Sequence, residues 1–301
     1  MIKSYPKILP LVGKYSEYAL GVNVEVTEKI DGSQFVFGKD PDGKLHMRSK
    51  GALIQADGDV QKLFRPAVDH VLAIQDKLPI DTVFYSETLS CKRHNTLEYN
   101  RVPNNHIMLY GMTDFAQTHI NPSYRILEQC AKAFDVEAVP LIGEYYTEYL
   151  PKYSELLDRE SILGGPKVEG IVIKNYHTSL MINNSLVPFV ALKLVSEAFK
   201  EKHSNNPEYI PQTSKLEQVI SAYRTEARWH KAVQHLRDSG LLVGEPKDIA
   251  LLMPELVRDL VEEEKENFKE ELYNIYQKQW KSHVTRGFPE WYKKSLLGET
   301  N

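Results

Sequence analysis

The pattern of hydrophobic and polar positions changes near residue 200. Before that point, short runs of β-branched and aromatic residues are separated by turn signals. Valines alternate with polar neighbours over residues 22–26, as in a strand with one buried face. The run 34–38 is followed by the turn sequence Asp-Pro-Asp-Gly at 40–43 and then by the run 44–48, which predicts an antiparallel hairpin.

The rest of the chain divides into a mixed part and a helical part. Further strands are expected at 82–87, 106–112, 170–174 and 189–195, with helices at 60–77 and 123–134. Strands without regular helical crossovers favour an α+β fold with mostly antiparallel sheets. After a polar, proline-containing link at 205–212, helices are expected at 215–239, at 246–260 or beyond, and at 262–281. The pattern predicts one domain over 1–204 and a helical C-terminal domain over 205–301.

Composition is that of a folded, water-soluble protein. The 301 residues are 42% hydrophobic and 26% charged, enough for one large domain or about two ordinary ones. Two cysteines, Cys91 and Cys130, cannot form a disulfide framework, and no metal-binding cysteine or histidine motif is present. We find no secretory signal and no apolar run of the roughly 20 residues that span a bilayer. These features predict a cytoplasmic protein without membrane contact.

The charge is unevenly distributed. The formal net charge of −4 argues at first against a nucleic-acid partner, because phosphate binding relies on Lys and Arg. Residues 245–272, however, hold ten acids and four bases, so the remainder of the chain sums to +2. This balance is compatible with a locally basic groove.

The segment Thr27-Glu28-Lys29-Ile30-Asp31-Gly32-Ser33 is the first candidate for chemistry. It places Lys29 at the end of a strand and directly before a tight turn, where the side chain is presented rigidly. The alternative is an ordinary hairpin turn with a solvated lysine, since Asp-Gly is a favoured turn dipeptide.

The second candidate is the segment Glu169-Gly170-Ile171-Val172-Ile173-Lys174. A strand's period of two places Glu169 on one face with Ile171 and Ile173, and Lys174 on the other. The alternative is that the two charged residues only flank a buried strand. A third segment, 190–196, carries Lys193 on another apolar strand.

The order of these segments resembles a known family. Six segments resemble motifs I, Ia, III, IIIa, IV and V of the covalent nucleotidyltransferases, which comprise ATP-dependent DNA ligases, RNA ligases and mRNA capping enzymes: Lys29-Ile30-Asp31-Gly32, Arg48-Ser49-Lys50-Gly51, Tyr85-Ser86-Glu87, Leu109-Tyr110-Gly111, Glu169 to Lys174, and Leu192-Lys193. A glutamate directly before the lysine is most similar to RNA ligases of the phage and editing type. The resemblance spans about residues 20–197 and implies a nucleotidyltransferase (adenylation) domain.

The resemblance assigns the nucleotide site. It makes Lys29 the nucleophile, with Glu28 and Ile30 beside the adenine edge. Asp31 counts among the catalytic residues and shapes the turn. Arg48, with Lys50 as a fallback, would contact the ribose and orient the 5′-phosphate end.

The remaining motifs complete the implied site. Glu87 would read a ribose hydroxyl and Tyr110 would stack on the purine. Glu169 would hold Mg²⁺ or Mn²⁺, and carboxylate oxygens suit such a cation. Lys174 and Lys193 would contact the base or the α-phosphate of ATP.

Two positions depart from the family pattern. Motif V commonly has two lysines spaced by one residue, and the first is replaced by Ala191 here. Motif IIIa usually has an acid after its aromatic residue, and here that position is Gly111. No segment after residue 200 resembles the OB-fold of DNA ligases and capping enzymes, which favours the RNA ligases.

The implied chemistry requires a neutral lysine. With an ordinary pKa of about 10.4, roughly one Lys29 side chain in 2,500 is neutral at pH 7. Lowering that pKa by about three units takes some 4 kcal/mol, which nearby cations and desolvation supply. Lys174, Lys193 and a bound Mg²⁺ are the expected cations.

The resemblance implies an ATP-dependent RNA ligase that seals 5′-phosphate and 3′-hydroxyl RNA ends through lysyl-AMP and RNA-adenylate intermediates, in RNA repair. Within the superfamily, a DNA ligase or a GTP-dependent capping guanylyltransferase is the alternative. An inactive RNA-binding protein with the same fold is the alternative of another class. RNA is the expected partner, and no protein partner is evident.

Other residues have competing interpretations. The run 91–94, Cys-Lys-Arg-His, is expected to be a solvated loop rather than a phosphate or metal site. The indoles of Trp229, Trp280 and Trp291 are expected to pack inside the helical domain rather than stack on bases. Basic residues at 278–294 are candidates for contact with a phosphate backbone.

Overall fold

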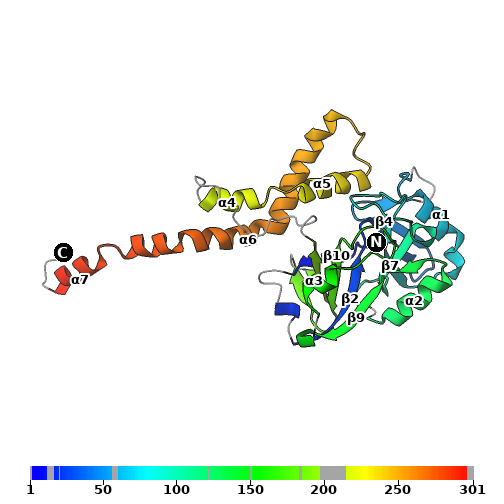
Figure 1. Cartoon of the computed structure of the whole chain (residues 1–301), viewed down its shortest axis with the longest axis horizontal. Coiled ribbons are helices and arrows are strands. Elements are labelled where there is room, and N and C mark those ends of the chain that lie inside the picture. Colours follow the sequence, from blue (N-terminus) through cyan, green and yellow to red (C-terminus); the bar gives the residue numbers. More distant parts are fainter. Residues whose placement is uncertain are drawn as a thin grey trace.

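The computed structural model describes residues 2–11, 17–19, 21–55, 60–120, 122–149, 151–182, 185–196 and 215–296. Figure 1 shows two sheets and their helices in one body, from which a long C-terminal helix extends. The expected α+β fold with mostly antiparallel sheets and a helical C-terminal region is confirmed.

Two sheets form the N-terminal body. The first has the strand order β1 (Leu9–Pro10), β13 (Val190–Val195), β10 (Gly170–Asn175), β2 (Asn23–Lys29), β9 (Leu141–Tyr146). The second has the order β5 (Leu53–Ile54), β4 (Leu45–Ser49), β3 (Ser33–Lys39), β6 (Thr82–Thr88), β7 (Ile107–Asp114), β8 (Glu137–Ala138). A separate hairpin joins β11 (Leu180–Ile182) to β12 (Ser185–Val187). The β1–β13 and β7–β8 pairings are parallel, and the other pairings of the described strands are antiparallel.

Apolar side chains cover both faces of each sheet. The outer face of the second sheet packs on α1 (Arg65–Ala73) and α2 (Tyr124–Ala133) around Phe35, Phe84 and Phe134. The outer face of the first sheet packs on α3 (Tyr153–Leu157). Between the sheets lies a cluster that includes Tyr5, Val36, Tyr85, Val172 and Ala191. The candidate site lies at the edge of this inner layer.

The hydrophobic pattern predicts seven of the described strands and does not predict β1, β5, β8, β9, β11 and β12, of which β9 is the longest. No residue of β9 is buried: its first three residues and Tyr145 are half-buried and the other two are exposed, so it carries no run of buried apolar positions. The strand is fixed instead by its antiparallel pairing with β2, in which Val24 lies opposite Tyr145. Strand pairing of this kind is a tertiary constraint that overrides weak local preference.

The C-terminal helices differ from the predicted boundaries. The expected helix 215–239 is two helices, α4 (Lys215–Ala222) and α5 (Glu226–Asp238), because the Thr225 side chain accepts from the Arg228 N–H and caps a new helix. The two helices expected over 246–281 are one helix, α6 (Ile249–Thr285), which is followed by α7 (Phe288–Leu296). No glycine or proline interrupts residues 260–262, and glutamate is a good helix former.

The expected domain boundary after residue 204 and the link 205–212 lie outside the described residues. Within the described part of the chain, no helix combines the length and the apolar run that a bilayer span requires.

Candidate active site

Strand register brings Lys29 to Glu169. In the antiparallel β2–β10 pair, Lys29 lies opposite Gly170, so the residue before Gly170 lies beside the end of β2. The Lys29 Nζ is 2.7 Å from both carboxylate oxygens of Glu169. A side chain at Gly170 would collide with the β13 backbone, since an added Cβ would lie 2.3 Å from the carbonyl oxygen of Leu194. The glycine therefore permits the pairing that joins the two motifs.

The predicted faces of this segment are correct for the strand and wrong for Glu169. Ile171 and Ile173 face the outer core, while Lys174 lies on the inner face. Glu169, however, precedes β10, which begins at Gly170. The alternation of a strand does not extend to a residue outside it, so Glu169 turns toward Lys29 on the inner side.

The ion pair sets the protonation of Lys29. Burial acts to lower the pKa of the Lys29 ammonium, but Glu169, with smaller contributions from Glu87 and Asp31, raises it above its ordinary value. The sequence predicts a lowered pKa, and this structure shows the opposite. The physical reason is that carboxylates, not cations, are the charges nearest to Lys29.

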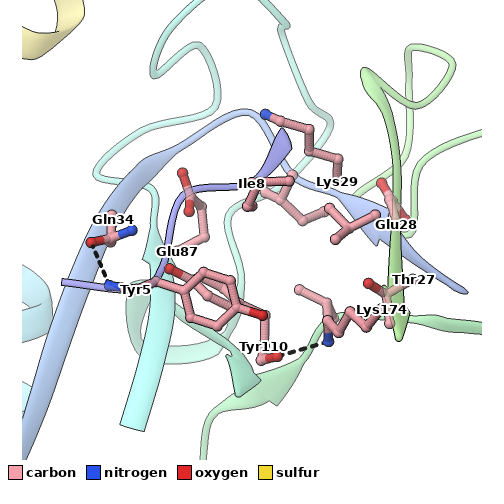
Figure 2. Close-up of a pocket in the computed structure, with 12 residues that line it drawn as sticks. Tyr5, Ile8, Thr27, Glu28, Lys29, Gln34, Glu87, Tyr110 and Lys174 are labelled. Carbon is pink, nitrogen blue, oxygen red and sulfur yellow. Dashed lines mark hydrogen bonds between the residues drawn. The ribbon is translucent and has the colours of Figure 1, made fainter. Parts of the chain in front are cut away.

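A pocket that is open to solvent lies beside Lys29. Figure 2 shows Glu87, Tyr5, Tyr110 and Lys174 around it, with Lys29 at its margin. Its lining is Tyr5, Ile8, Thr27, Glu28, Lys29, Ile30, Gln34, Glu87, Tyr110, Val139, Val172 and Lys174. The expected motifs I, III, IIIa and IV therefore meet at one pocket.

Glu87 lies at the end of β6 and lines the pocket. Burial raises the pKa of its carboxyl to about 8, although the nearby Lys29 ammonium lowers it and Glu169 raises it further. The carboxyl therefore holds its proton at neutral pH in this arrangement. A protonated carboxyl both donates and accepts hydrogen bonds, which suits recognition of a ribose hydroxyl.

Tyr5 and Tyr110 form one wall of the pocket, and Tyr85 packs against both rings. Tyr110 lies edge-to-face with Tyr5, with ring centroids 4.9 Å apart, and parallel to Tyr85 at 6.4 Å. Sequence reasoning missed Tyr5, because its N-terminal segment carries no motif or strong periodicity. Both departures from the family pattern lie near Tyr5. A Cβ on Gly111 would be 3.4 Å from the Tyr5 ring, and Ala191 is buried in the cluster that contains Tyr5.

Lys174 is already paired. Its Nζ donates to Glu25 Oε1 at 2.8 Å and to the carbonyl oxygen of Tyr110 at 2.9 Å, and both charged side chains are almost fully buried. Glu25 and Lys174 are direct partners in the β2–β10 register. The charge of Lys174 is thus offset by Glu25, which reduces its influence on Lys29.

Lys193 and Lys50 lie on the same side of the site. Lys193 faces Val172 across the β10–β13 pair and lowers the pKa of the Glu169 carboxyl, whose net shift is upward because of burial. Burial and the charges of Lys231 and Lys193 lower the pKa of Lys50. These lysines form the cationic margin of the site.

Arg48 does not reach the pocket formed by the described residues. Its guanidinium donates to the backbone carbonyls of Ile2, Ser49 and Lys50 at 2.9–3.1 Å. These bonds fix the N-terminal segment beside β4. Contact of Arg48 with a ribose remains a prediction.

Glu28 points away from Lys29. As its neighbour on β2, it faces the opposite side of the sheet, where its carboxylate accepts from the Ser161 hydroxyl at 2.5 Å and the Ile162 N–H at 3.2 Å. Burial raises its pKa, and these bonds lower it. Glu28 and the buried Ile30 are both among the residues that line the pocket.

Asp31 shapes the loop after Lys29. Its Oδ2 accepts from the backbone N–H groups of Thr96 and Leu97 at 2.8 and 2.7 Å, and its own N–H donates to the Tyr99 hydroxyl. A Cβ at Gly32 would lie 2.7 Å from the Thr88 carbonyl oxygen, so only glycine fits there. Asp31 therefore acts on the geometry of the turn.

The loop 91–94 is only partly the solvated loop that the sequence predicts. Residues 91–93 are exposed, but His94 is buried. His94 Nδ1 accepts from the Ser90 N–H at 3.0 Å, and its Nε2 lies 2.9 Å from Ser33 Oγ. Sequence reasoning missed His94, and also Gln234 and Asp238 of α5, which contact the same turn.

His94 makes stability depend on pH. Burial lowers the pKa of its imidazole to about 4, with Arg237 acting in the same direction. The unfolded chain binds the proton near pH 6.5, so the free energy of unfolding falls by about 3 kcal/mol as the pH falls from 6.5 to 4. Urea denaturation at several pH values measures this slope. His94→Gln should flatten it, and an unchanged slope in the variant would contradict the assignment.

The carboxylates beside Lys29 suit a divalent cation held largely by a substrate. Glu169 lies beside Lys29, and its charge acts on Glu87. Within the described ranges, no three metal-binding side chains converge on one point. Mg²⁺ is commonly held by one or two carboxylates together with substrate phosphates, so Glu169 fits as a protein ligand.

Comparison with known proteins shows the family to which the chain belongs. The family model described as RNA ligase matches residues 22–194, more than half of the sequence. The chain belongs to the RNA ligase family. The matched region contains the strands that carry Lys29, Glu87, Tyr110, Lys174 and Lys193.

One solved structure with a TM-score of 0.50 shares the fold of this family member, and a second solved structure is similar. A Naegleria gruberi RNA ligase with PPi matches with a TM-score of 0.50 and 16% identity, covering 65% of this chain and 56% of that one. A lysine-to-alanine variant of a Naegleria gruberi RNA ligase with ATP and Mn matches with a TM-score of 0.49 and 16% identity, covering 65% and 56%. This chain thus spans just over half the length of the Naegleria chains. No curated protein sequence matches it.

Proposed function

We propose that this protein is an ATP-dependent RNA ligase. In the first step Lys29 Nζ bonds to the α-phosphorus of ATP, and pyrophosphate leaves. AMP then passes from Lys29 to the 5′-phosphate of an RNA end. Finally a 3′-hydroxyl attacks that activated phosphate, forming the phosphodiester and releasing AMP. The proposed task is the repair or sealing of broken RNA.

One observation carries the proposal. Lys29, Glu87 and Tyr110 come from three different strands and line one pocket, and Glu169 is bonded to the lysine. The arrangement lies inside the region that matches the RNA ligase family. A lysine at a strand end beside carboxylates and an aromatic wall provides a nucleophile, polar recognition of a ribose and a surface for a purine.

The residues have separate tasks in the proposed reaction. Lys29 attacks as a free amine, so it must lose a proton and its bond to Glu169. Glu169 would then hold Mg²⁺ or Mn²⁺, which supplies neutralisation of phosphate charge. Lys193, at the cationic margin, would stabilise negative charge on the α-phosphate.

Covalent labelling tests the function. The full chain is incubated with radiolabelled ATP, GTP or NAD⁺ and run on a denaturing gel, and we expect a labelled protein band with ATP. RNA and DNA strands with 5′-phosphate and 3′-hydroxyl ends are then offered, and we expect sealing of RNA. Labelling by GTP would favour a capping guanylyltransferase, and sealing of DNA alone would favour a DNA ligase. RNA binding without any labelled band would identify an inactive RNA-binding protein.

Lys193→Ala tests the cationic margin. Lys193 is half-buried at the edge of the described core, so its removal should change stability little. Loss of a charge that stabilises a reacting phosphate costs on the order of 100-fold in rate. We expect the rate of lysine adenylation to fall by about that factor, measured in a single turnover, while the melting temperature barely moves. Wild-type rates in the variant would remove Lys193 from the mechanism.

We also propose that the C-terminal domain binds RNA through its end. The C-terminal arm, defined here as residues 273–296, extends away from the body (Figure 1) and holds five basic residues against one acid. Trp280 and Trp291, expected to be packed, are 58% and 55% exposed. Exposed aromatic rings between basic residues can stack on bases and contact phosphates.

Salt dependence of RNA binding tests the arm. The double variant Lys278→Gln/Lys281→Gln should weaken binding of single-stranded RNA and reduce the slope of log K against log salt by about 1.4. Labelling of Lys29 by ATP should be unchanged, because the arm lies away from the pocket. An unchanged slope together with a loss of dimers in sedimentation would instead make the arm an interface between copies.

The cysteines support the proposal of a reducing, cytoplasmic setting. Both Cys91 and Cys130 are free thiols. The proposed cytoplasmic location rests on the sequence, whose two cysteines cannot form a disulfide framework.

A further inference from the structure

The turn after Lys29 is held by the helical domain. Gln234 Nε2, on α5, donates to the carbonyl oxygen of Gly32 at 2.6 Å. Ser33 Oγ donates to Asp238 Oδ1, at the end of α5, at 2.9 Å. Ser33 and Asp238 are buried, with 0% and 4% exposed, so their bond is shielded from solvent, and the Gln234 bond is partly buried. Two residues of one helix thus contact the two residues that complete the turn.

The direction of these bonds follows from His94. Its Nδ1 accepts from the Ser90 N–H, which leaves the proton of the neutral imidazole on Nε2. Nε2 therefore donates to Ser33 Oγ, whose own proton goes to Asp238. The chain of bonds ends on a carboxylate of α5, and removing that acceptor leaves a buried hydroxyl donor without its partner.

A second route joins α5 to the same turn. Arg237 donates to the Asn95 side-chain oxygen, and Asn95 Nδ2 donates to the Gly32 carbonyl oxygen at 2.7 Å. The Gly32 carbonyl is thus shared by Gln234 and Asn95. A carbonyl fixed by two donors from different elements has little freedom to rotate.

The position of residues 32–33 matters because the nearby Lys29 amine must approach the α-phosphorus of ATP in line with the bond to pyrophosphate. A displacement of about 1 Å of a reacting group can cost on the order of 100-fold in rate. Lys29 lies three residues before Gly32, and the residues between them are fixed by Asp31 and by the turn itself.

We propose that α5 is a positioning element of the nucleotidyl transfer site, in which Gln234 and Asp238 hold residues 32–33 so that Lys29 is presented to the α-phosphate of ATP. The inference rests on the proposed ligase function and deepens it. It assigns the helical domain a part in the first chemical step, in addition to any binding of RNA. Neither residue lines the pocket; both contact the turn, and the charge of Asp238 also raises the pKa of Glu87.

Asp238→Ala is the principal test, with three readouts on the full chain. The maximal rate of Lys29 adenylation at saturating ATP should fall about 10- to 100-fold. The KM for ATP should stay within about threefold, because Asp238 does not line the nucleotide pocket. Sealing of pre-adenylated RNA should stay within about twofold, because that step does not use the lysine as a nucleophile.

Further variants separate positioning from general damage. Asp238→Asn keeps an oxygen acceptor for Ser33 and should restore most of the adenylation rate. Asp248→Ala is the matched control: Asp248 is buried in the same domain but bonds only to backbone N–H groups of residues 243–245 in the described contacts. The control should lower the melting temperature without lowering the adenylation rate. Ser33→Ala combined with Asp238→Ala should be no slower than Asp238→Ala alone.

The outcomes are distinct. A wild-type chain that takes no label from ATP refutes the proposed function. A labelled wild type together with wild-type adenylation in both Asp238→Ala and Gln234→Ala refutes the positioning role alone. Equal losses in adenylation and in sealing of pre-adenylated RNA, shared by Asp248→Ala, would also refute it, because the effect would then be global. If Asp238→Ala does not fold, the milder Gln234→Ala decides by the same comparison.

Discussion

Lys29→Arg should abolish the labelled adduct with ATP while the protein remains folded. A guanidinium keeps the ion pair with Glu169, so the environment of the strand end is preserved. A guanidinium stays protonated at any working pH, so its neutral form is far rarer than that of lysine, and we expect labelling to fall by at least about 1,000-fold. Single-turnover labelling followed by a denaturing gel measures the loss.

Lys167→Arg is the control for that experiment. Lys167 is also ion-paired, with Asp158, but its side chain is 72% exposed and does not line the pocket. The control should label like the wild type. Lys29→Arg should still seal pre-adenylated RNA, since the amine is not consumed in that step. A labelled Lys29→Arg variant would show that a different residue accepts AMP.

Glu25→Gln should destabilise the protein strongly. Glu25 and Lys174 are buried partners at 2.8 Å, and the amide would leave the lysine charge without compensation. Removing one member of a buried pair typically costs 3–5 kcal/mol, and we expect about 4 kcal/mol in the free energy of unfolding. Urea denaturation monitored by tryptophan fluorescence measures it.

Two further variants test whether the uncompensated charge of Lys174 causes the loss of stability. Glu128→Gln removes an acid from an exposed pair with Lys132 and should change stability by less than about 1 kcal/mol. The double variant Glu25→Gln/Lys174→Met also removes the uncompensated lysine charge and should recover much of the lost free energy of unfolding. A stable Glu25→Gln protein would mean that Lys174 is solvated or neutral. If the double variant folds yet adenylates slowly, Lys174 also acts on the nucleotide.

Local sequence determined most of the longer strands and the order of the motifs. Alternation over β2 and the turn after β3 depend on neighbouring residues, so they can be read without tertiary information. The boundary errors have local causes as well. The Thr225 cap divides one predicted helix, and the absence of a breaker near residue 261 joins two others.

The sequence alone established that a lysine at the end of a strand is followed by an Asp-Gly turn, in a chain whose motifs resemble those of RNA ligases. Only the tertiary structure decided what surrounds that lysine. Glu169 approaches it through the β2–β10 register, Tyr5 enters the pocket from the N-terminal segment, and Asp238 reaches the turn from the helical domain. These residues are far apart along the chain, and contacts formed across such separations leave no periodic or spacing signal in the sequence, because they are selected by packing between elements.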